Sequence, residues 1–316
     1  MSFAKYTRVS MNKPRILVFA YHDVGFECLD VLLRRRDDII AVITHEDNPQ
    51  EQIWFRSVAD LARINDIPVY TPGSVNTPDW ASRIQGWNPA IIFSFYYRNM
   101  IQEDILNIPR LGSFNMHGSL LPRYRGRAPI NWAVLHGEKE TGVTLHHMVK
   151  RADAGDIVDQ KTVPIAQEDT AHDVFRKAVK AARLVLERQI DGLLNGTAPR
   201  RKQDESRATY FGGRRPEDGR IDWTQGAETI YNLIRAVTHP YPGAFTVSGG
   251  QKLFVWRARP VKGTEEKPGK VVSLNPLRVA TGSGSLEIIT LQWSGKDEED
   301  ASAGTHRLQN GQMLGF

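Results

Sequence analysis

Short apolar runs alternate with segments of helical periodicity along the first half of the chain. Four of the runs, at residues 15–20, 39–44, 67–71 and 90–95, have the length and the bounding polar residues of buried strands. The segments between them have the apolar pattern of amphipathic helices. Because strands that alternate with helices form right-handed βαβ units, the pattern predicts an α/β domain with a Rossmann-like, mostly parallel sheet covered on both faces.

Three helices are expected between these strands, over residues 24–35, 57–66 and 77–86. The third begins with Thr77 and a proline, which is a common helix start, and Gly86 is its expected end. The other expected elements of this domain are strands at 112–118, 141–149 and 157–165 and a helix from Thr170 to Leu194.

The pattern changes in the last third of the chain. Residues 196–219 are polar and charged and contain several Gly and Pro, which is typical of a domain boundary. One helix is expected at 227–237, and the closely spaced short strands after it predict a small C-terminal β-barrel, OB-like, or a sandwich. The expected organisation is a flexible leader at 1–13, a catalytic domain at 14–200, a linker at 201–219 and the barrel-like domain at 220–316.

Composition places the chain among ordinary globular proteins. It has 316 residues, of which 41% are hydrophobic and 24% are charged. A net charge of +5 permits anionic substrates but is too small over this length to indicate nucleic-acid binding. No run of about 18 apolar residues is present. The N-terminus also lacks the apolar core of a signal peptide, so no membrane insertion is expected.

A single cysteine, Cys28, excludes a disulfide within the chain and indicates a reducing, cytoplasmic compartment. It lies in an apolar helical pattern, so we interpret it as a small buried side chain and not as a catalytic thiol. The start of the protein is open on sequence grounds, because Met11 could serve as an alternative initiator.

Several familiar catalytic motifs are missing. The first strand is followed by YHDVGFEC at residues 21–28, where a dinucleotide site would need G-x-G-x-x-G, so no NAD is expected. The chain also lacks G-x-x-x-x-G-K-[ST], G-x-S-x-G, C-x-x-C and H-E-x-x-H, which argues against a P-loop enzyme, an α/β-hydrolase and a metal site. His146 and His147 are adjacent in an expected strand and point to opposite faces, so both are interpreted as structural.

Residues capable of catalysis are concentrated in FNMHGSLLPRYRGRAP (114–129), at the carboxyl end of an expected strand, where α/β sheets bind their ligands. Asn115 and His117 are two positions apart and share one face of that strand. An imidazole can transfer protons near neutral pH and an amide N–H can stabilise an oxyanion, so the pair suits acyl transfer through a tetrahedral intermediate. The stretch lacks a carboxylate to orient the histidine, and Asp153 in the loop KRADAGD is a candidate.

Two alternatives remain open on these residues alone. Asn115 and His117 could be buried side chains that bond only to the backbone. Arg123, Arg125 and Arg127 could form a solvated face or could bind an anionic ligand. Spacing does not separate these alternatives.

Three long motifs, in the same order as in a known family, connect the sequence with that family. They are N-x-H followed by SLLPRYRG (119–126), then GRAPINWAVLHGEKETGVTLHHM (126–148), then ADAGDIV (152–158). With them the sequence resembles the folate-dependent formyltransferases over nearly its whole length, from RILVFA to LEIITLQ. The resemblance implies a Rossmann-like catalytic domain that uses 10-formyltetrahydrofolate, followed by a small barrel-like domain.

The resemblance also implies roles for individual residues. Asn115, His117 and Asp153 correspond to the catalytic triad of the family. The residues that correspond to folate contacts are Asn99, Met100, Ile101, Arg127, Val149, Lys150, Arg151 and Ala152. Neither a metal ion nor NAD belongs to the implied reaction.

Two branches of the family compete. One formylates methionyl-tRNA, and the other formylates UDP-4-amino-4-deoxy-L-arabinose in the lipid A modification that gives polymyxin resistance. The tRNA branch is expected to carry a basic insertion after the second strand, whereas THEDNPQEQIWF (44–55) is acidic and contains no Lys or Arg. The segments FAYHDVG, FSFYYR and VKRADAGDIV also resemble the sugar-nucleotide branch. We therefore expect a UDP-amino-sugar acceptor and no nucleic-acid substrate.

One departure from that branch concerns length. Its best-known member is fused to a decarboxylating dehydrogenase, and this sequence has no second nucleotide-binding fingerprint, so a stand-alone formyltransferase is expected. A folate-binding module without catalysis is a third alternative, which the intact set of Asn115, His117 and Asp153 disfavours. The pattern gives no indication of the oligomeric state.

Overall fold

The computed structural model describes residues 13–49, 51–263, 266–304 and 306–315, and the chain forms two compact units. One unit comprises the chain up to Pro129 with Thr141–Pro164 and Arg176–Phe211. The other comprises Ile130–Glu140, Ile165–Phe175 and the chain from Gly212 onward. The leader expected at 1–13 lies outside the described residues except for Lys13, and so does the alternative initiator Met11.

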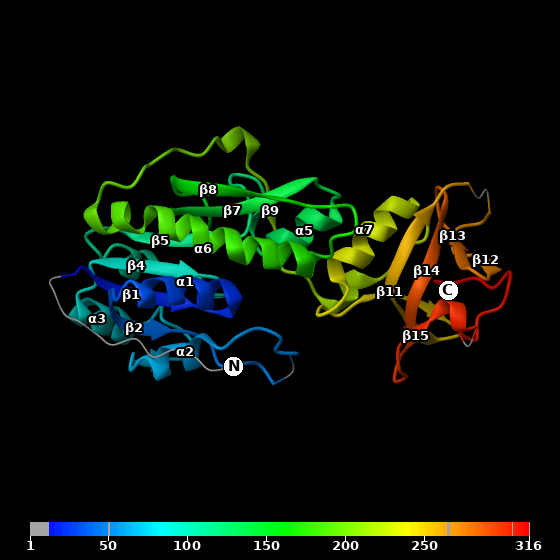
Figure 1. Cartoon of the computed structure of the whole chain (residues 1–316), viewed down its shortest axis with the longest axis horizontal. Helices are drawn as coiled ribbons and strands as arrows, with labels where there is room; N and C mark the ends of the chain where they lie inside the picture. Colours follow the sequence, from blue (N-terminus) through cyan, green and yellow to red (C-terminus); the bar gives the residue numbers. More distant parts are fainter. Residues whose placement is uncertain (1–12, 50, 264–265, 305, 316) are drawn as a thin grey trace. The chain divides into compact units, whose positions relative to one another are not determined.

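The first unit is built on a seven-stranded sheet in the order β3-β2-β1-β4-β5-β7-β8 (Figure 1). Neighbouring strands from β3 to β5 are parallel, whereas β7 runs antiparallel to β5. The expected mostly parallel sheet is therefore confirmed. Its strands are β1 (Arg15–Ala20), β2 (Asp38–Ile43), β3 (Val69–Tyr70), β4 (Ile91–Phe95), β5 (Ser113–His117), β7 (Glu140–His147) and β8 (Ile157–Pro164).

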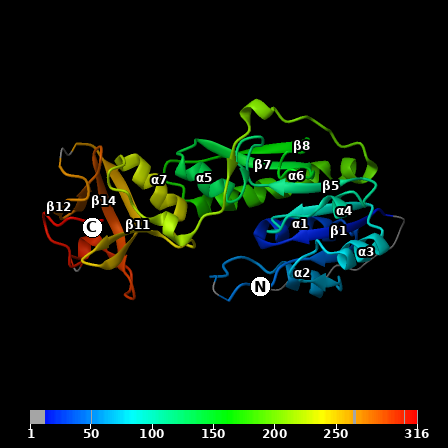
Figure 2. The same cartoon turned by 180° about the vertical axis from the view of Figure 1, so that it is seen from behind.

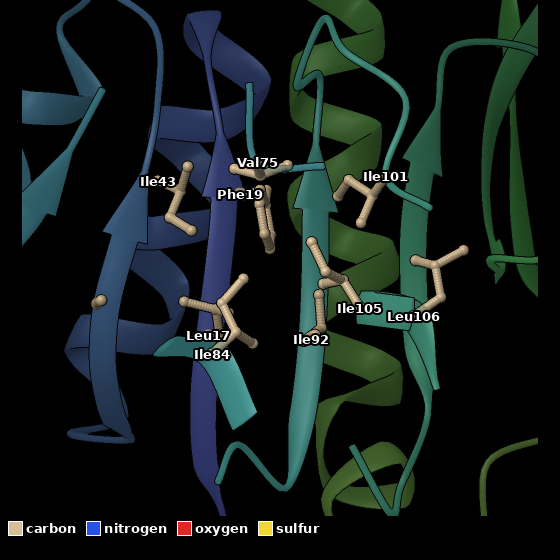
Figure 3. Close-up of a cluster of buried hydrophobic side chains, with 10 residues drawn as sticks. Leu17, Phe19, Ile43, Val75, Ile84, Ile92, Ile101, Ile105 and Leu106 are labelled. Atoms are coloured by element: carbon tan, nitrogen blue, oxygen red, sulfur yellow. The ribbon is translucent and has the colours of Figure 1, made fainter. Parts of the chain in front are cut away.

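Helices cover both faces of this sheet. Leu17, Phe19 and Ile92 point to one face, where they pack against Ile84 and Ile105, while two helices, α1 and α6, pass behind the strands (Figure 3). Alternate residues of one strand thus serve two layers of the core. The helices of the unit are α1 (His22–Arg34), α2 (Val58–Ile64), α3 (Pro78–Trp87), α4 (Glu103–Leu106) and most of α6 (Ala171–Asn195).

Two local expectations can be compared with these helices. Cys28 in α1 is fully buried, and burial raises the pKa of its thiol, so its interpretation as a core side chain is confirmed. At the start of α3 the Thr77 hydroxyl accepts the backbone N–H of Trp80 at 3.3 Å, as the helix-start signal predicts. The end expected at Gly86 was wrong, because the helix continues to Trp87 and Asn88 takes the left-handed turn with φ 47°.

The second unit contains an antiparallel sheet in the order β10-β11-β14-β13-β12, with β15 paired to β14. Helix α7 packs against β11 (Figure 2). The expected C-terminal antiparallel domain is confirmed, although β10 was missed. The elements are α5 (Pro129–Leu135), α7 (Ala227–Val237), β10 (Ala244–Ser248), β11 (Gln251–Val261), β12 (Val271–Leu274), β13 (Leu277–Ala280), β14 (Ser285–Trp293) and β15 (Glu299–Asp300).

The C-terminal segment joins the two end strands of that sheet. The backbone N–H of Gly311 donates to the carbonyl oxygen of Val271, and the backbone N–H of Val271 donates to the carbonyl oxygen of Gln312, each at 2.8 Å. The backbone N–H of Gly315 donates to Val247 in β10, also at 2.8 Å. The segment therefore bridges β12 and β10, which gives the sheet its barrel-like closure.

Residues of the expected linker 201–219 take part in the first unit. Gln203, Glu205 and Tyr210 all bond to the side chain of Arg125. The boundaries expected at 14–200, 201–219 and 220–316 stay a prediction, which limited proteolysis followed by mass spectrometry can test.

Replacing Leu314 with alanine should destabilise the C-terminal segment and the sheet that it closes. Its side chain is 1% exposed, so the change should lower the free energy of unfolding by about 3 kcal/mol. Leu274, which is 37% exposed, is the matched control, and Leu274→Ala should cost less than about 1 kcal/mol. Urea denaturation measures both; equal losses would show that the segment does not hold the sheet.

Candidate active site

Asn115 and His146 face each other across two neighbouring strands. In the antiparallel register of β5 and β7, Asn115 is directly opposite His146, so both side chains project from the same face. The Asn115 Nδ2 atom lies 3.2 Å from His146 Nε2. His147 projects from the other face, where its ring lies 4.6 Å from the ring of Phe114. The structural interpretation of His146 is therefore incomplete, because the side chain belongs to the predicted catalytic cluster.

Asp153 completes the cluster from the loop between β7 and β8. Its Oδ1 atom lies 3.5 Å from His117 Nδ1, 3.5 Å from His146 Nε2 and 3.5 Å from Asn115 Nδ2. Its Oδ2 atom accepts the backbone N–H of Gly126 at 2.8 Å. The structure thus brings together the three residues that the sequence singles out, and it adds a fourth side chain and a backbone donor.

The ring of His117 is oriented by the loop that follows β5. His117 Nε2 lies 2.7 Å from the carbonyl oxygen of Tyr124, and a carbonyl can only accept, so this nitrogen carries a proton. The opposite nitrogen, Nδ1, is the one that faces Asp153. The Ser119 hydroxyl donates to the Arg123 carbonyl at 2.6 Å and holds the same loop. His117 is thus left with one ring nitrogen available for chemistry.

The charge of Asp153 is maintained by its neighbours. Its side chain is only 12% exposed, and burial by itself would raise the pKa of the carboxyl. The favourable interactions with His117 and His146 and the hydrogen bond from Gly126 outweigh burial and lower this pKa well below its usual range. Asp153 is therefore a carboxylate throughout the neutral range, where it can stabilise positive charge on either imidazole.

Gly126 has a structural reason to be glycine. It belongs to β6 (Arg125–Gly126), which pairs with β9 (Tyr210–Phe211), and its φ is 97°. A Cβ atom at this position would lie 2.2 Å from the carbonyl oxygen of Phe211. Only glycine therefore allows this backbone to run beside β9 and to present its N–H to Asp153.

The three arginines of the stretch have different environments. The Arg125 side chain is fully buried and bonds to Gln203, Glu205 and Tyr210, so the alternative that it binds an anionic ligand was wrong. Arg123 lies over the ring of Tyr124 at 5.5 Å. Arg127 is exposed, which leaves it as the arginine of this loop best placed for an anion.

The described part of the chain lacks two further features. Within it, no group of three or more His, Cys, Asp and Glu side chains is placed to hold a metal ion. None of its helices is both long enough and apolar enough to cross a lipid bilayer.

Comparison with known families shows the family to which the chain belongs. Residues 15–190 match the family described as Formyl transferase, and residues 214–307 match the Formyl transferase C-terminal domain. The chain belongs to the formyltransferase family. The resemblance to the formyltransferases is thereby confirmed, and the protein is an enzyme of this family.

Solved structures share the fold of this formyltransferase. The N-formyltransferase from Helicobacter canadensis in complex with folinic acid and dTDP-3-aminofucose has a TM-score of 0.70 and 20% identity, covering 86% of this chain and 98% of that one. WlaRD, a sugar 3N-formyltransferase in the presence of dTDP and 5-N-formyl-THF, has a TM-score of 0.66 and 21% identity, covering 91% and 100%.

HypX from Aquifex aeolicus in complex with tetrahydrofolic acid is a longer relative of the same fold. It has a TM-score of 0.63 and 17% identity, and the match covers 95% of this formyltransferase and 49% of the HypX chain. The chain therefore spans about half the length of the HypX proteins that it matches.

Apart from Arg127, the residues expected to contact folate lie on two loops of the formyltransferase. Asn99 and Met100 follow β4, and the Met100 side chain is 54% exposed. The second loop follows β7, and its Lys150 forms an ion pair with Glu103 of α4 at 3.4 Å, so the two loops are adjacent. The members of the second loop are Val149, Lys150 and Arg151, which are exposed, and Ala152, which is half-buried.

Ile101, another position expected to meet the folate, has a buried side chain. Its side chain is 6% exposed and packs in the core cluster beside Ile105, on one face of the sheet (Figure 3). The side chain is therefore not available to a ligand, and only the backbone of this position could contact folate.

Proposed function

We propose that this formyltransferase transfers the formyl group of 10-formyltetrahydrofolate to the 4-amine of UDP-4-amino-4-deoxy-L-arabinose, giving the UDP-4-formamido sugar of lipid A modification. The cluster of Asn115, His117 and Asp153 beside two exposed loops supports the proposal most strongly. The Helicobacter canadensis protein was solved with folinic acid and an amino-sugar nucleotide, and WlaRD with 5-N-formyl-THF and dTDP. Both kinds of ligand therefore occur on this fold.

The reaction requires one bond to form and one to break. The lone pair of the neutral amine attacks the formyl carbon, and the carbonyl oxygen becomes an oxyanion. Collapse of this intermediate breaks the bond from carbon to N10 of the folate. The amine loses one proton and N10 gains one, so a group that first accepts and then donates a proton completes the balance. His117, through Nδ1, is placed for that role, and the carboxylate of Asp153 stabilises the imidazolium in between.

Asn115 is proposed to stabilise the oxyanion. Its amide nitrogen, Nδ2, carries two hydrogens and lies 3.2 Å from His146 Nε2 and 3.5 Å from Asp153 Oδ1. The longer contact is at the limit of a hydrogen bond, so exchanging it for an oxyanion costs little. The contact with His146 would then keep the amide in place while its second N–H donates to the reacting oxygen.

The acidic loop after β2 supports a sugar-nucleotide acceptor over a tRNA. The Tyr21 hydroxyl donates to Asp47 at 2.7 Å, and Arg98 pairs with Glu51 at 2.9 Å. The ring of Phe55 stacks on that of His22 at 3.9 Å. These contacts hold the loop onto residues that follow β1 and β4, and its acidic side chains offer no attraction to a phosphate backbone.

Replacing Arg127 with alanine tests the folate side of the proposal. The change should raise the KM for 10-formyltetrahydrofolate about 10- to 100-fold, because a charge-assisted hydrogen bond to a folate carboxylate is lost. Steady-state kinetics with varied folate measures it, and kcat should change less. Arg110→Ala, at another exposed arginine, is the matched control. A KM that is equal in the wild type and Arg127→Ala would contradict the assignment.

The acceptor is tested by turnover. The purified protein is incubated with 10-formyltetrahydrofolate and either UDP-4-amino-4-deoxy-L-arabinose or methionyl-tRNA, and release of tetrahydrofolate is followed with His117→Ala as the blank. Release with the sugar nucleotide alone, together with a product 28 mass units heavier (about the mass of the added CO), is the expected outcome. Release with tRNA alone would overturn the acceptor but not the chemistry. If the wild type releases tetrahydrofolate no faster than the blank with either acceptor, both acceptors are excluded and other amino-sugar nucleotides are the next to test.

A further inference from the structure

Gln203 lies beside the Asp153 loop, and both ends of its amide are engaged. Its Nε2 atom donates to the carbonyl oxygens of Asp153 and Gly155, each at 2.7 Å. Its Oε1 atom accepts from the Nε and Nη2 atoms of Arg125, at 3.1 and 2.7 Å. The reversed amide would set an oxygen against two carbonyl oxygens and N–H groups against a guanidinium, so these partners allow one orientation.

The buried Arg125 holds Gln203 in that orientation. Its side chain is 0% exposed, and its remaining donors reach the Glu205 carboxylate at 3.1 and 2.5 Å and the Tyr210 hydroxyl at 2.6 Å. A planar guanidinium that is bonded on every side cannot swing away. The position of Gln203 is therefore determined by packing inside the first unit and not by solvent.

Asp153 needs such support because its backbone is in an unfavourable conformation. Its φ is 55°, in the left-handed region that residues other than glycine seldom adopt. In this conformation the loop turns the carboxylate toward His117 and His146. The two hydrogen bonds from Gln203, to the carbonyls of Asp153 and Gly155, hold the turn from the outside.

We propose that Gln203 is a positioning residue for formyl transfer, which holds the carboxylate of Asp153 at the catalytic histidine and is itself oriented by Arg125. The proposal rests on the proposed catalytic role of Asp153. Arg151, one of the expected folate contacts, also donates to Glu205, at 3.1 Å. The segment that supports Asp153 is therefore joined to the loop expected to meet the folate.

The electrostatic state of Asp153 gives the proposal a direct readout. The pKa of the carboxyl is low because His117, His146 and the Gly126 N–H outweigh burial, and each of these contacts depends on where the carboxylate lies. A displaced carboxylate should titrate closer to its ordinary value of about 3.9. The titratable and charged groups that face Asp153 from the surrounding elements are His117 of β5, His146 of β7 and, beyond Gln203, Arg125 and Glu205.

The first arm of the test is kinetic. Gln203→Met keeps the volume of the side chain but removes all four hydrogen bonds. It should lower kcat about 10- to 100-fold and leave the KM for 10-formyltetrahydrofolate within about threefold, because a small displacement of a catalytic group slows chemistry more than it weakens binding. Gln189→Met is the matched control: this half-buried glutamine of the same unit donates to Asp159 and contacts no residue of the cluster.

The second arm does not depend on the acceptor. The protein is labelled with ¹³C at the aspartate carboxyl carbons, the Asp153 signal is assigned by its loss in Asp153→Asn, and it is titrated by NMR between about pH 3 and pH 7. The wild-type signal should stay at the carboxylate position throughout. In Gln203→Met it should titrate within this range, and in Gln189→Met it should not.

The outcomes separate the two proposals. A slower Gln203→Met enzyme whose Asp153 signal titrates supports the positioning role. A kcat within twofold of the wild type, or a loss of kcat with an unchanged Asp153 titration and a parallel fall in unfolding temperature, would overturn it. If the wild type does not formylate the sugar nucleotide, the proposed function fails while the NMR titration still decides the role of Gln203.

Discussion

Replacing His117 with alanine is expected to lower kcat about 1,000-fold while the KM for 10-formyltetrahydrofolate changes by less than about threefold. The imidazole of His117 turns its Nδ1 atom toward the carboxylate of Asp153, on the face of the sheet that carries Asn115. Its removal takes away proton transfer and a positive charge beside the oxyanion, and it leaves the exposed folate loops intact. Single-turnover measurements with saturating folate isolate the chemical step.

His147 supplies the matched control for this experiment. It is a histidine of the adjacent strand whose ring packs on Phe114, and burial, with the charge of Arg200, lowers its pKa to about 4. It is therefore neutral at the pH of the assay and turned away from the cluster. His147→Gln should keep kcat within about threefold. Near-normal turnover by His117→Ala would end the assignment of His117 as the proton carrier.

Asp153→Asn is expected to lower kcat about 100- to 1,000-fold, because the change keeps the shape of the side chain but removes the charge that stabilises the His117 imidazolium. Steady-state kinetics at neutral pH measures the loss, and folate binding by calorimetry serves as the control. An enzyme that loses folate affinity as strongly as kcat would contradict a role confined to chemistry.

The same substitution has a signature in stability. The pKa of Asp153 is depressed in the folded protein, so its ionisation stabilises the fold at pH values above the unfolded-state pKa of about 3.9. That contribution is lost as the pH falls from this value toward the lower folded-state pKa. The difference in unfolding free energy between the wild type and Asp153→Asn should therefore be constant from pH 7 to about 5 and should shrink below about pH 4. Urea denaturation at several pH values measures it; a difference that does not vary with pH would mean that the carboxylate is not stabilised by its neighbours.

The sequence was sufficient for the architecture because hydrophobic patterning is a local signal. Continuous apolar runs such as 15–20 and 90–95 can be buried on both faces only in the middle of a covered parallel sheet, and both are central strands of the structure. The spacing of Asn115 and His117 was equally informative, because side chains two apart on a strand share a face wherever the strand lies. The long motifs around these residues were enough to indicate the family, which the comparisons confirm.

Several features of the site could not be predicted, because they depend on residues that are distant in the chain. His146 enters the cluster through the antiparallel register that sets it opposite Asn115, and the sequence does not specify that register. Arg125 was interpreted as a candidate anion ligand because its partners Gln203 and Glu205, 78 and 80 residues away, lie in a segment that has the composition of a linker.

The sequence by itself therefore determined the mostly parallel sheet and the antiparallel C-terminal domain, and it singled out Asn115, His117 and Asp153 as candidates, because periodicity and motifs depend on residues that are close together in the chain. Tertiary structure alone decided which nitrogen of His117 faces the site, that His146 lies beside the same carboxylate, and that Gln203, bonded to the buried Arg125, donates to the Asp153 loop. Hydrogen-bond partners, burial and electrostatic shifts arise only when segments far apart in the chain are packed together, and they cannot be read from a local pattern.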